Sequence, residues 1–296
     1  MTRALQPGLV ALLGYPVEHS LSPAMHNAAF AHYGLDLRYV LLPVPPERFD
    51  EQVRLCVAEG YAGWNVTVPH KERMVAYLNE AAAEVTATGA CNTVRVEDGR
   101  LSGFNTDVVG FMAGLDEAGG IEPGSRAVLL GAGGAARAVA VALARAGHDV
   151  AVLARRPEQA ESLARALRTS SGKAPAHGGL ARASLARALD GAALLVNCTP
   201  TGTWPHEQET PLPEGVLLPE RLLVYDLVYR PRPTRLLRDA AGTGCRTQDG
   251  LAMLVNQGAA AFELWTGKTA PLSLMREACI AELSGAAPNM AITIER

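Results

Sequence analysis

The sequence predicts an α/β fold with two sets of strands, each covered by helices. Short apolar runs, rich in Val and Leu, alternate with longer segments of helical periodicity. This alternation is typical of βαβ units, which build largely parallel sheets. It pauses within residues 107–124 and then starts again, so we expect a domain boundary there. With 48% hydrophobic and 19% charged residues, the 296-residue chain can bury two ordinary cores.

The first set of elements ends before residue 70. Its strands are continuous apolar runs, and the last run is ended by Pro69. Its first helix carries Pro23 near the start. Proline is tolerated there because N–H groups of the first helical turn make no hydrogen bond within the helix. The expected elements are a strand at 9–13, a helix at 22–33, a strand at 37–44, a helix at 49–59 and a strand at 63–68.

The second set begins at residue 127. The segment 169–179 is rich in Ser, Gly, Ala and Pro and is expected to be a surface loop, and residues 286–296 a loose tail. The expected elements are strands at 127–130, 149–154, 194–198 and 222–227, helices at 135–146 and 157–167, and helical structure within 251–285.

Composition excludes several classes of protein. The net charge of -3 gives no reason to expect nucleic acid or an anionic membrane as a partner. No apolar run reaches the roughly 18 residues of a spanning helix, and the first ten residues do not resemble a secretory signal. The five cysteines are scattered and form no CxxC pair, so neither a metal site nor a disulfide framework is expected. Reduced cysteines in a cytoplasmic protein are the simplest interpretation.

A glycine-rich turn joins the strand at 127–130 to the helix after it. It consists of Gly131, Ala132, Gly133, Gly134 and Ala135. Glycines in this place let the backbone approach a pyrophosphate, which the helix N-terminus then binds through free N–H groups. A plain tight turn is the alternative. The strand before the turn and the helix after it favour dinucleotide binding.

The end of the next strand predicts which dinucleotide is bound. An NAD site usually has Asp or Glu there, about 20 residues after the glycine turn, to bind the ribose hydroxyls. This chain has Ala154, Arg155 and Arg156 instead. Two guanidinium groups suit a 2′-phosphate, so we expect NADP. The alternative is a solvated arginine pair at the start of a helix.

Polar clusters also follow the predicted strands of the first set, where α/β sheets bind ligands. Together with motifs of the second set, they resemble the shikimate dehydrogenase family. The motifs are HSxSPxxHN at 19–27, NVTVPHK at 65–71, Asn92-Thr93, Asn105-Thr106-Asp107, GAGGAAR at 131–137, NCTPTG at 197–202, YDLVY at 225–229, and DGLAML at 249–254 leading to Gln257. They cover most of the chain in the family's order.

The resemblance implies two α/β domains separated by a cleft. Residues 1–107 with 252–296 would form the substrate-binding domain, and residues 108–251 a Rossmann-like NADP-binding domain. The implied reaction is the reversible, NADPH-dependent reduction of 3-dehydroshikimate to shikimate, on the route to chorismate and the aromatic amino acids. This small-molecule substrate would be the partner, and the chain would be a monomer or a homodimer.

The resemblance also implies site residues. Lys71 and Asp107 match the catalytic pair, for which an ordinary salt bridge is the alternative interpretation. The residues that match the family's substrate contacts are Ser20 and Ser22 for the carboxylate, Thr67, Asn92 and Gln257 for the ring hydroxyls, and Tyr229 beside substrate and nicotinamide. Leu227 and Gly250 match cofactor contacts, as do the glycine turn and the two arginines. Ser22 also suits a helix cap, and the neutral polar residues suit turns.

Three positions depart from the family pattern. Ala154-Arg155-Arg156 replaces Asn-Arg-Thr, Val108 replaces a glycine and Cys91 replaces a valine. None removes a catalytic group, but Arg156 leaves the degree of NADP selectivity open. A quinate/shikimate dehydrogenase is the nearest alternative, although Ser22 agrees with the shikimate-specific pattern. A non-catalytic ligand sensor is less consistent with Lys71 and Asp107, and a folate-type dehydrogenase lacks support from the serines.

Overall fold

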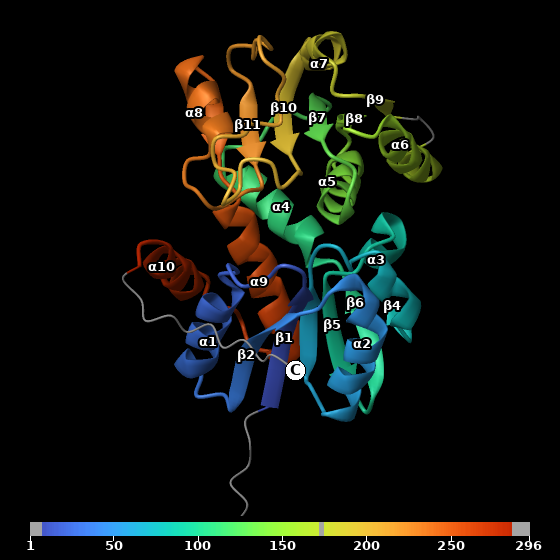
Figure 1. The fold of residues 1–296 in the computed structure, drawn as a ribbon, viewed down its shortest axis with the longest axis vertical. Coiled ribbons are helices and arrows are strands. Elements are labelled where there is room, and N and C mark those ends of the chain that lie inside the picture. Colours follow the sequence, from blue (N-terminus) through green and yellow to red (C-terminus); the bar gives the residue numbers. More distant parts are fainter. Residues whose placement is uncertain (1–7, 172–174, 286–296) are drawn as a thin grey trace, which may run out of the picture. The chain divides into compact units, whose positions relative to one another are not determined.

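The computed structural model describes residues 8–171 and 175–285 and divides the chain into two compact units. The first unit comprises residues 1–106 and 257–296, and the second comprises residues 107–256. Each unit has its own sheet, covered by helices (Figure 1). The α/β class expected from the sequence is confirmed.

The sheet of the first unit is mixed, with the strand order β2-β1-β3-β5-β6-β4. Strands β1, β2 and β3 are parallel, whereas β5 runs antiparallel to both β3 and β6. Because β6 is antiparallel to β5 and β4 pairs parallel with β6, five of the six strands run the same way, and the expectation of a largely parallel sheet fails only at β5. The strands are β1 (Gly8–Gly14), β2 (Leu37–Pro43), β3 (Gly63–Val66), β4 (Glu80–Ala81), β5 (Thr93–Glu97) and β6 (Arg100–Phe104).

The antiparallel pair is a hairpin closed by Asp98 and Gly99. Both residues have positive φ, 50° and 73°, as the tightest hairpin turns require. Asp-Gly is a sequence favoured in such turns because Gly lacks a Cβ and Asp tolerates the left-handed region. The hairpin turns the chain back, so that β6 ends where β3 ends.

The helices of the first unit include two from the end of the chain. Helix α1 has Leu21 at its N-cap and no side-chain cap, so the alternative interpretation of Ser22 as the helix cap does not hold. Gly258 of α9 lets α1 approach closely, since a Cβ there would lie 2.4 Å from Met25 Cε. The helices are α1 (Ser22–His32), α2 (Phe49–Ala58), α3 (Ala83–Thr88), α9 (Leu251–Thr266), which the unit boundary divides, and α10 (Leu272–Leu283), with short 3-10 helices η1 (Pro46–Arg48) and η2 (Arg73–Tyr77).

The sheet of the second unit is entirely parallel, with the order β12-β11-β10-β7-β8-β9. Counted from β7 within this unit, the order is 3-2-1-4-5-6, that of doubly wound dinucleotide-binding domains. The strands are β7 (Arg126–Leu130), β8 (Asp149–Leu153), β9 (Ala176–Gly178), β10 (Ala192–Asn197), β11 (Leu223–Asp226) and β12 (Arg246–Gln248). The helices are α4 (Thr106–Glu117), α5 (Gly134–Arg145), α6 (Pro157–Ser171), α7 (Arg182–Leu189) and α8 (Arg235–Gly242).

The loop expected at 169–179 is only partly correct. Helix α6 continues to Ser171, and Ala176–Gly178 forms the edge strand β9 beside β8. This strand has only three residues, none of them strongly apolar, so its pattern is too short to recognise. Residues 172–174 and the tail expected at 286–296 lie outside the described residues.

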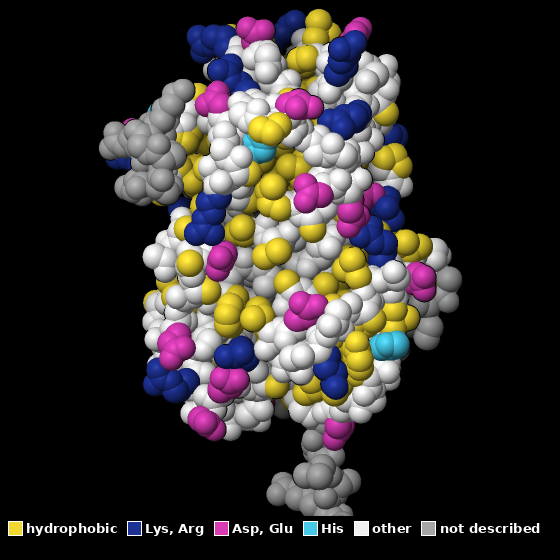
Figure 2. Space-filling model, turned by 180° about the vertical axis from the view of Figure 1, so that it is seen from behind, with side chains coloured by type: hydrophobic (Ala, Val, Ile, Leu, Met, Phe, Trp, Pro, Cys, Tyr) yellow, Lys and Arg dark blue, Asp and Glu magenta, His cyan; other side chains and the backbone are white. Residues whose placement is uncertain are grey.

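The described part of the chain shows neither a membrane-spanning helix nor a cluster of side chains that could hold a metal ion. Within residues 8–171 and 175–285, no helix is long and apolar enough to cross a membrane. The same residues contain no group of three or more His, Cys, Asp or Glu side chains with metal-binding geometry. On the face drawn in Figure 2, basic and acidic side chains are interspersed.

Candidate active site

The polar loops of the first unit meet at one end of its strands, the carboxyl end of the parallel ones. Strands β1, β3 and β6 end there, and β5 begins there because it runs the opposite way. The backbone N of Val66 donates to the carbonyl of Asn92 (2.8 Å), and the N of Asn92 donates to Phe104 (3.1 Å). The N of Thr67 donates to Leu13 (2.9 Å). The end-of-strand clusters expected to form a site are thus brought together by sheet pairing.

Asn92 lies at the centre of a buried hydrogen-bond network. Its Oδ1 accepts from the backbone N of Thr106 (2.7 Å), and its Nδ2 donates to Thr106 Oγ1 (3.0 Å) and to Gln257 Oε1 (3.4 Å). Asn92 and Gln257 are 2% and 8% exposed. Because the Asn92 amide is held at both ends, its orientation is fixed. Two residues predicted to bind ring hydroxyls are therefore in contact.

A second layer supports Asn92 from within the sheet. Tyr39 Oη donates to Asn65 Oδ1 (2.7 Å), and Asn65 Nδ2 donates to the Asn92 carbonyl (3.1 Å) and to Thr93 Oγ1 (2.9 Å). The Thr93 and Thr106 hydroxyls lie 3.1 Å apart. Sequence reasoning missed the supporting role of Tyr39, Thr93 and Thr106. Tyr39 sits in an ordinary apolar strand, whereas the Asn-Thr pairs at 92–93 and 105–106 were visible signals.

The two predicted carboxylate-binding serines are hydrogen-bonded to each other. Ser20 Oγ donates to Ser22 Oγ at 3.2 Å and accepts from the backbone N of Ser22 at the same distance. Their loop follows β1 and touches the loop that follows β3. A Cβ at Gly14 would lie only 2.2 Å from Thr67 Cγ2, so Gly14 is required for this approach. Thr67 therefore adjoins the loop that carries the serines.

Lys71 is attached to the fold through its neighbours. Its carbonyl accepts from the backbone N of Cys91 (2.8 Å), one residue before Asn92. The preceding residue, His70, is 1% exposed, and its Nε2 lies 2.6 Å from the carbonyl of Val44. A carbonyl can only accept, so Nε2 carries the hydrogen. Burial lowers the pKa of His70, which favours the neutral ring.

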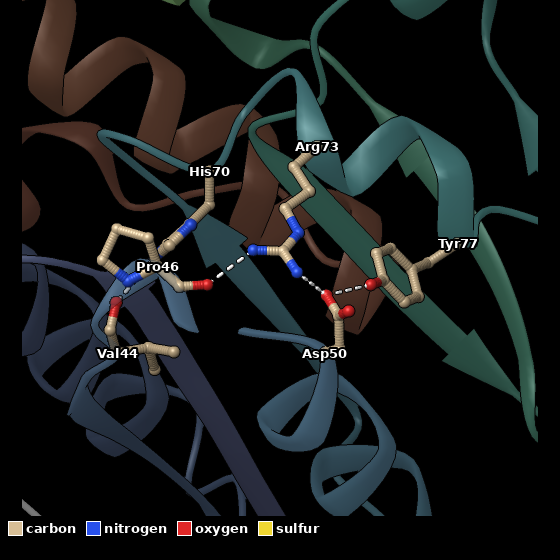
Figure 3. Close-up of polar contacts among 6 residues, drawn as sticks. All are labelled: Val44, Pro46, Asp50, His70, Arg73 and Tyr77. Atoms are coloured by element: carbon tan, nitrogen blue, oxygen red, sulfur yellow. Dashed lines mark hydrogen bonds and ion pairs between the residues drawn. The ribbon is translucent and has the colours of Figure 1, made fainter. Parts of the chain in front are cut away.

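Arg73 ties the other side of this loop to α2 (Figure 3). Its guanidinium donates to the carbonyl of Pro46 (2.5 Å) and to the carboxylate of Asp50, which also accepts from Tyr77 Oη. It lies 5.5 Å from the centre of the Phe49 ring, in cation–π geometry. The hydrogen bond from Tyr77 is the main cause that lowers the pKa of Asp50. The segment around Lys71 is held on both sides.

In the second unit, the glycine turn predicted to bind a pyrophosphate joins β7 to α5. Gly131 has φ +110°, a value that L side chains rarely adopt, and its N donates to Leu153 (2.7 Å). A Cβ at Gly131 would lie 3.1 Å from Thr199 Cγ2, whereas a Cβ at Gly133 would meet nothing within 4 Å. Helix α5 begins at Gly134, so its first N–H groups face the open space above Gly133.

The predicted 2′-phosphate residues follow β8. Ala154 is 3% exposed and its N donates to Gly178, while Arg155 and Arg156 are exposed at the start of α6. No acidic side chain occupies this position. Elsewhere in the unit, Gly250 packs against Leu227, since a Cβ there would lie 2.1 Å from the Leu227 carbonyl oxygen.

The remaining predicted residues divide between the two units. Lys71 belongs to the first unit, whereas Asp107 and Tyr229 belong to the second. Asp107 lies in the first turn of α4 and is 4% exposed, directly after Thr106 of the Asn92 network. Tyr229 is half-buried. The pairing of Lys71 with Asp107 stays a prediction from the resemblance.

A doubly wound parallel sheet with an open glycine turn, next in sequence to an α/β unit with a buried polar site, defines a two-domain dehydrogenase. Residues 12–94 match the family described as shikimate dehydrogenase substrate binding domain, and residues 250–280 match the shikimate 5'-dehydrogenase C-terminal domain. A shikimate dehydrogenase (NADP(+)) of Moorella thermoacetica is 49% identical over 285 residues, covering 95% of this chain and 96% of the relative. The chain belongs to the shikimate dehydrogenase family.

Solved structures agree with this assignment. The crystal structure of shikimate 5-dehydrogenase from Thermus thermophilus, in complex with NADP(H) and shikimate, has a TM-score of 0.81 and 42% identity, over 92% of this chain and 98% of that one. A quinate dehydrogenase from Corynebacterium glutamicum, in complex with NAD, has a TM-score of 0.83 and 30% identity, over 93% and 99%. The resemblance seen in the sequence motifs is confirmed.

Proposed function

We propose that this protein catalyses the reversible, NADPH-dependent reduction of 3-dehydroshikimate to shikimate. The observation that carries the proposal is the buried Asn92–Gln257 contact, at the edge of the sheet where the loops of Lys71, Thr67 and Ser22 also lie. A neutral set of amides and hydroxyls suits a ring that carries several hydroxyl groups. Membership of the family supplies the identity of that ring.

The serines are suited to the substrate's carboxylate. Ser22 Oγ accepts the hydrogen of Ser20, so the hydrogen of Ser22 can be donated to a carboxylate oxygen. Ser22 is 4% exposed and therefore rigidly placed in the first turn of α1. A hydrogen bond to a charged group stabilises binding by about 1.5–3 kcal/mol.

The residues of the second unit fit NADP. Gly131 permits the tight turn, Gly133 leaves its backbone accessible, and Arg155 and Arg156 are exposed where an acidic residue would select NAD. We assign the pyrophosphate to residues 131–135, the 2′-phosphate to the two arginines, and further contacts to Leu227 and Gly250. When bound, NADPH supplies the hydride.

Lys71 is the proposed proton donor. Reduction of a ketone leaves negative charge on the oxygen, and an ammonium group in hydrogen-bond reach neutralises it. The bonds of His70, Arg73 and Cys91 hold the Lys71 backbone while its side chain reacts. Asp107 is proposed to orient the same substrate hydroxyl. In the reverse direction, Lys71 takes the proton back.

Quinate is the second candidate substrate, favoured by the structural similarity to a quinate dehydrogenase. Quinate carries one more hydroxyl, on the carbon that bears the carboxylate, so the serines beside that group decide acceptance. Ser22 favours shikimate. A ligand sensor on the same fold would bind both compounds without turnover.

We also propose a cytoplasmic location, because the five cysteines remain thiols.

The test is a steady-state assay of the purified protein with shikimate and quinate, each with NADP and NAD, followed by NADPH or NADH absorbance. We expect the highest kcat/KM with shikimate and NADP. Higher kcat/KM with quinate would reassign the substrate. Binding of shikimate without turnover would identify a sensor.

A further inference from the structure

The Asp226 carboxylate is fully buried at the end of β11, and the mechanism proposed above does not use it. Its Oδ1 accepts from Asn197 Nδ2 (2.9 Å) and from the backbone N of Val228 (3.1 Å). Its Oδ2 accepts from Thr234 Oγ1 (2.6 Å). Burying a carboxylate is unfavourable, and the three donors compensate part of that cost. A charged group retained in such a place indicates a role beyond packing.

The first two bonds determine the conformation of the chain on either side. Asn197 Nδ2 donates to Asp226 and to the carbonyl of Thr201 (3.3 Å), so Asn197 Oδ1 must face the opposite way. There it accepts from the backbone N (3.0 Å) and the Oγ1 (2.7 Å) of Thr199. If the Asn197 amide were flipped, its NH₂ group would face the N–H of Thr199, and its oxygen would face the Asp226 carboxylate. The carboxylate thus selects one orientation of Asn197, and with it the conformation of the turn at 198–202.

This turn forms a wall of the glycine turn. Thr199 Cγ2 lies 3.1 Å and the Cys198 carbonyl oxygen 3.4 Å from the position of the Cβ that Gly131 lacks. A shift of Thr199 would therefore move directly against the backbone proposed to bind the pyrophosphate. The N of Cys198 also donates to Leu130, the residue before Gly131 (2.9 Å).

The Val228 bond fixes a second cofactor segment. Leu227 N donates to the Asn197 carbonyl (3.1 Å), and Gly250 N donates to the Val228 carbonyl (3.2 Å). Leu227 and Gly250 are the two further residues assigned to the cofactor, and Tyr229 follows Val228. The Asp226 carboxylate therefore contacts both cofactor segments through its partners: Asn197 leads to the turn at 198–202, and Val228 belongs to the segment 227–229.

We infer that Asp226 is a positioning residue for the dinucleotide: it holds the turns at 131–134 and 227–229 in the shape that receives the cofactor, without touching it. This inference rests on the proposed binding of NADP by the second unit. It predicts that the affinity for NADP depends on a group with no contact to NADP.

Because Asp226 is buried, its effect on the affinity for NADP should depend on pH. Burial, with a smaller contribution from Asp249, raises the pKa of Asp226 to about 6, against the bonds from Thr234, Val228 and Asn197. The titratable groups that face it are Asp249, which is paired with Arg232 (2.6 Å), and Cys198, whose own pKa is raised beyond the usual range by burial. Below about pH 6 the carboxyl becomes neutral and accepts hydrogen bonds more weakly.

The experiment measures the Kd of NADP⁺ by calorimetry for the wild type, Asp226→Asn, Asn197→Ala and the double variant. We expect each single variant to weaken NADP⁺ binding about tenfold, the effect of roughly one hydrogen bond. The double variant should be little weaker than either, because both changes release the same turn. The Kd of shikimate, whose proposed contacts in the first unit are not bonded to Asp226, should stay unchanged.

Thr234→Val is the matched control, since it removes a bond to the same carboxylate but leaves Asn197 and Val228 bonded to Oδ1. Loss of this bond raises the pKa of Asp226 further, so at a pH well above that pKa, where the carboxylate stays ionised, Thr234→Val should keep the wild-type Kd for NADP⁺. At about pH 5 the difference between wild type and Asp226→Asn should shrink to about twofold, because the wild-type carboxyl is then neutral. Comparing the two proteins at each pH cancels the titration of the 2′-phosphate, whose pKa is about 6.

Unchanged NADP⁺ affinity in both single variants would overturn the inference while the proposed function stands. Additive losses in the double variant, or equal losses for shikimate, would show general damage and also overturn it. If the wild type itself does not bind NADP⁺, the proposed function falls first. If Asp226→Asn does not fold, Asn197→Ala and Thr234→Val still decide the question.

Discussion

The side-chain amides of Asn92 and Gln257 lie 3.4 Å apart, Nδ2 to Oε1, although 165 residues separate them in the chain. Thr106 bonds to both, so three segments distant in sequence close one buried network. This network lies beside the loop that carries Lys71, which makes Lys71 the first residue to test.

Replacing Lys71 by alanine should lower kcat by about 10²–10⁴, the usual contribution of a positioned proton donor. The KM for shikimate should change much less, because other groups hold the ring. Lys268→Ala is the control: this ammonium lies over the Tyr33 ring, 5.3 Å from its centre, and should be dispensable. Near-wild-type kcat in Lys71→Ala would exclude Lys71 as the acid–base group.

Ser22→Ala should act on substrate binding. Loss of one hydrogen bond to a carboxylate should raise the KM for shikimate roughly ten- to a hundredfold. Ser20→Ala should have a similar effect, because Ser20 orients the Ser22 hydroxyl. The KM for NADP, measured in the same variants, should stay constant. An effect on NADP alone would reassign this loop.

Arg155→Ala should weaken NADP binding selectively. Removing one charge-assisted bond to the 2′-phosphate should raise the Kd of NADP⁺ roughly ten- to a hundredfold and leave that of NAD⁺ nearly unchanged. Arg156→Ala should have the smaller effect. Arg165→Ala is a matched control on α6, since its side chain pairs with Glu161. Equal losses for NAD⁺ and NADP⁺ would contradict the assignment.

His26 should make stability depend on pH. Its ring is fully buried and stacked on Tyr39 at 4.5 Å, and burial lowers its pKa from 6.5 to about 3. The unfolded chain therefore binds a proton below pH 6.5 that the folded chain does not bind. Stability from this group is present above pH 6.5 and falls toward pH 3, by up to about 1.4 kcal/mol per pH unit.

Urea unfolding of the wild type and His26→Phe between about pH 4 and pH 7 measures this contribution. Phenylalanine keeps an aromatic ring against Tyr39 and cannot titrate. The free energy of unfolding of the variant should fall less on acidification than that of the wild type. Parallel curves would show that His26 does not control the acid response. Other groups, Asp226 among them, cancel in the difference between the two proteins.

The sequence predicted the strands that are continuous apolar runs and the helices that show helical periodicity. Strands β1, β2, β7, β8, β10 and β11 and helices α1, α2 and α5 lie within a few residues of their predicted positions. The β5–β6 hairpin was missed because charged and hydroxyl residues interrupt it, among them Arg95 and Ser102. Asp98-Gly99 was its one recognisable signal.

The candidate site was only partly predictable. The glycine turn is local, so its shape follows from adjacent residues. The Asn92 network is not local: Tyr39, Thr106 and Gln257 come together only through sheet pairing and the return of the chain. Motifs could name Asn92 and Gln257, but no spacing in the sequence could indicate that their side chains touch.

The return of the chain to the first unit has a consequence during synthesis. Residues 107–256 form one continuous stretch, whereas the first unit lacks α10 and most of α9 until after all of this stretch has been made. Until then, the apolar face of α1, including Met25 and Phe30, lacks Gly258 and Phe262 to cover it. In a nascent chain this face of α1 would thus stay exposed until α9 is made, and a chaperone that binds apolar surfaces would have access to it.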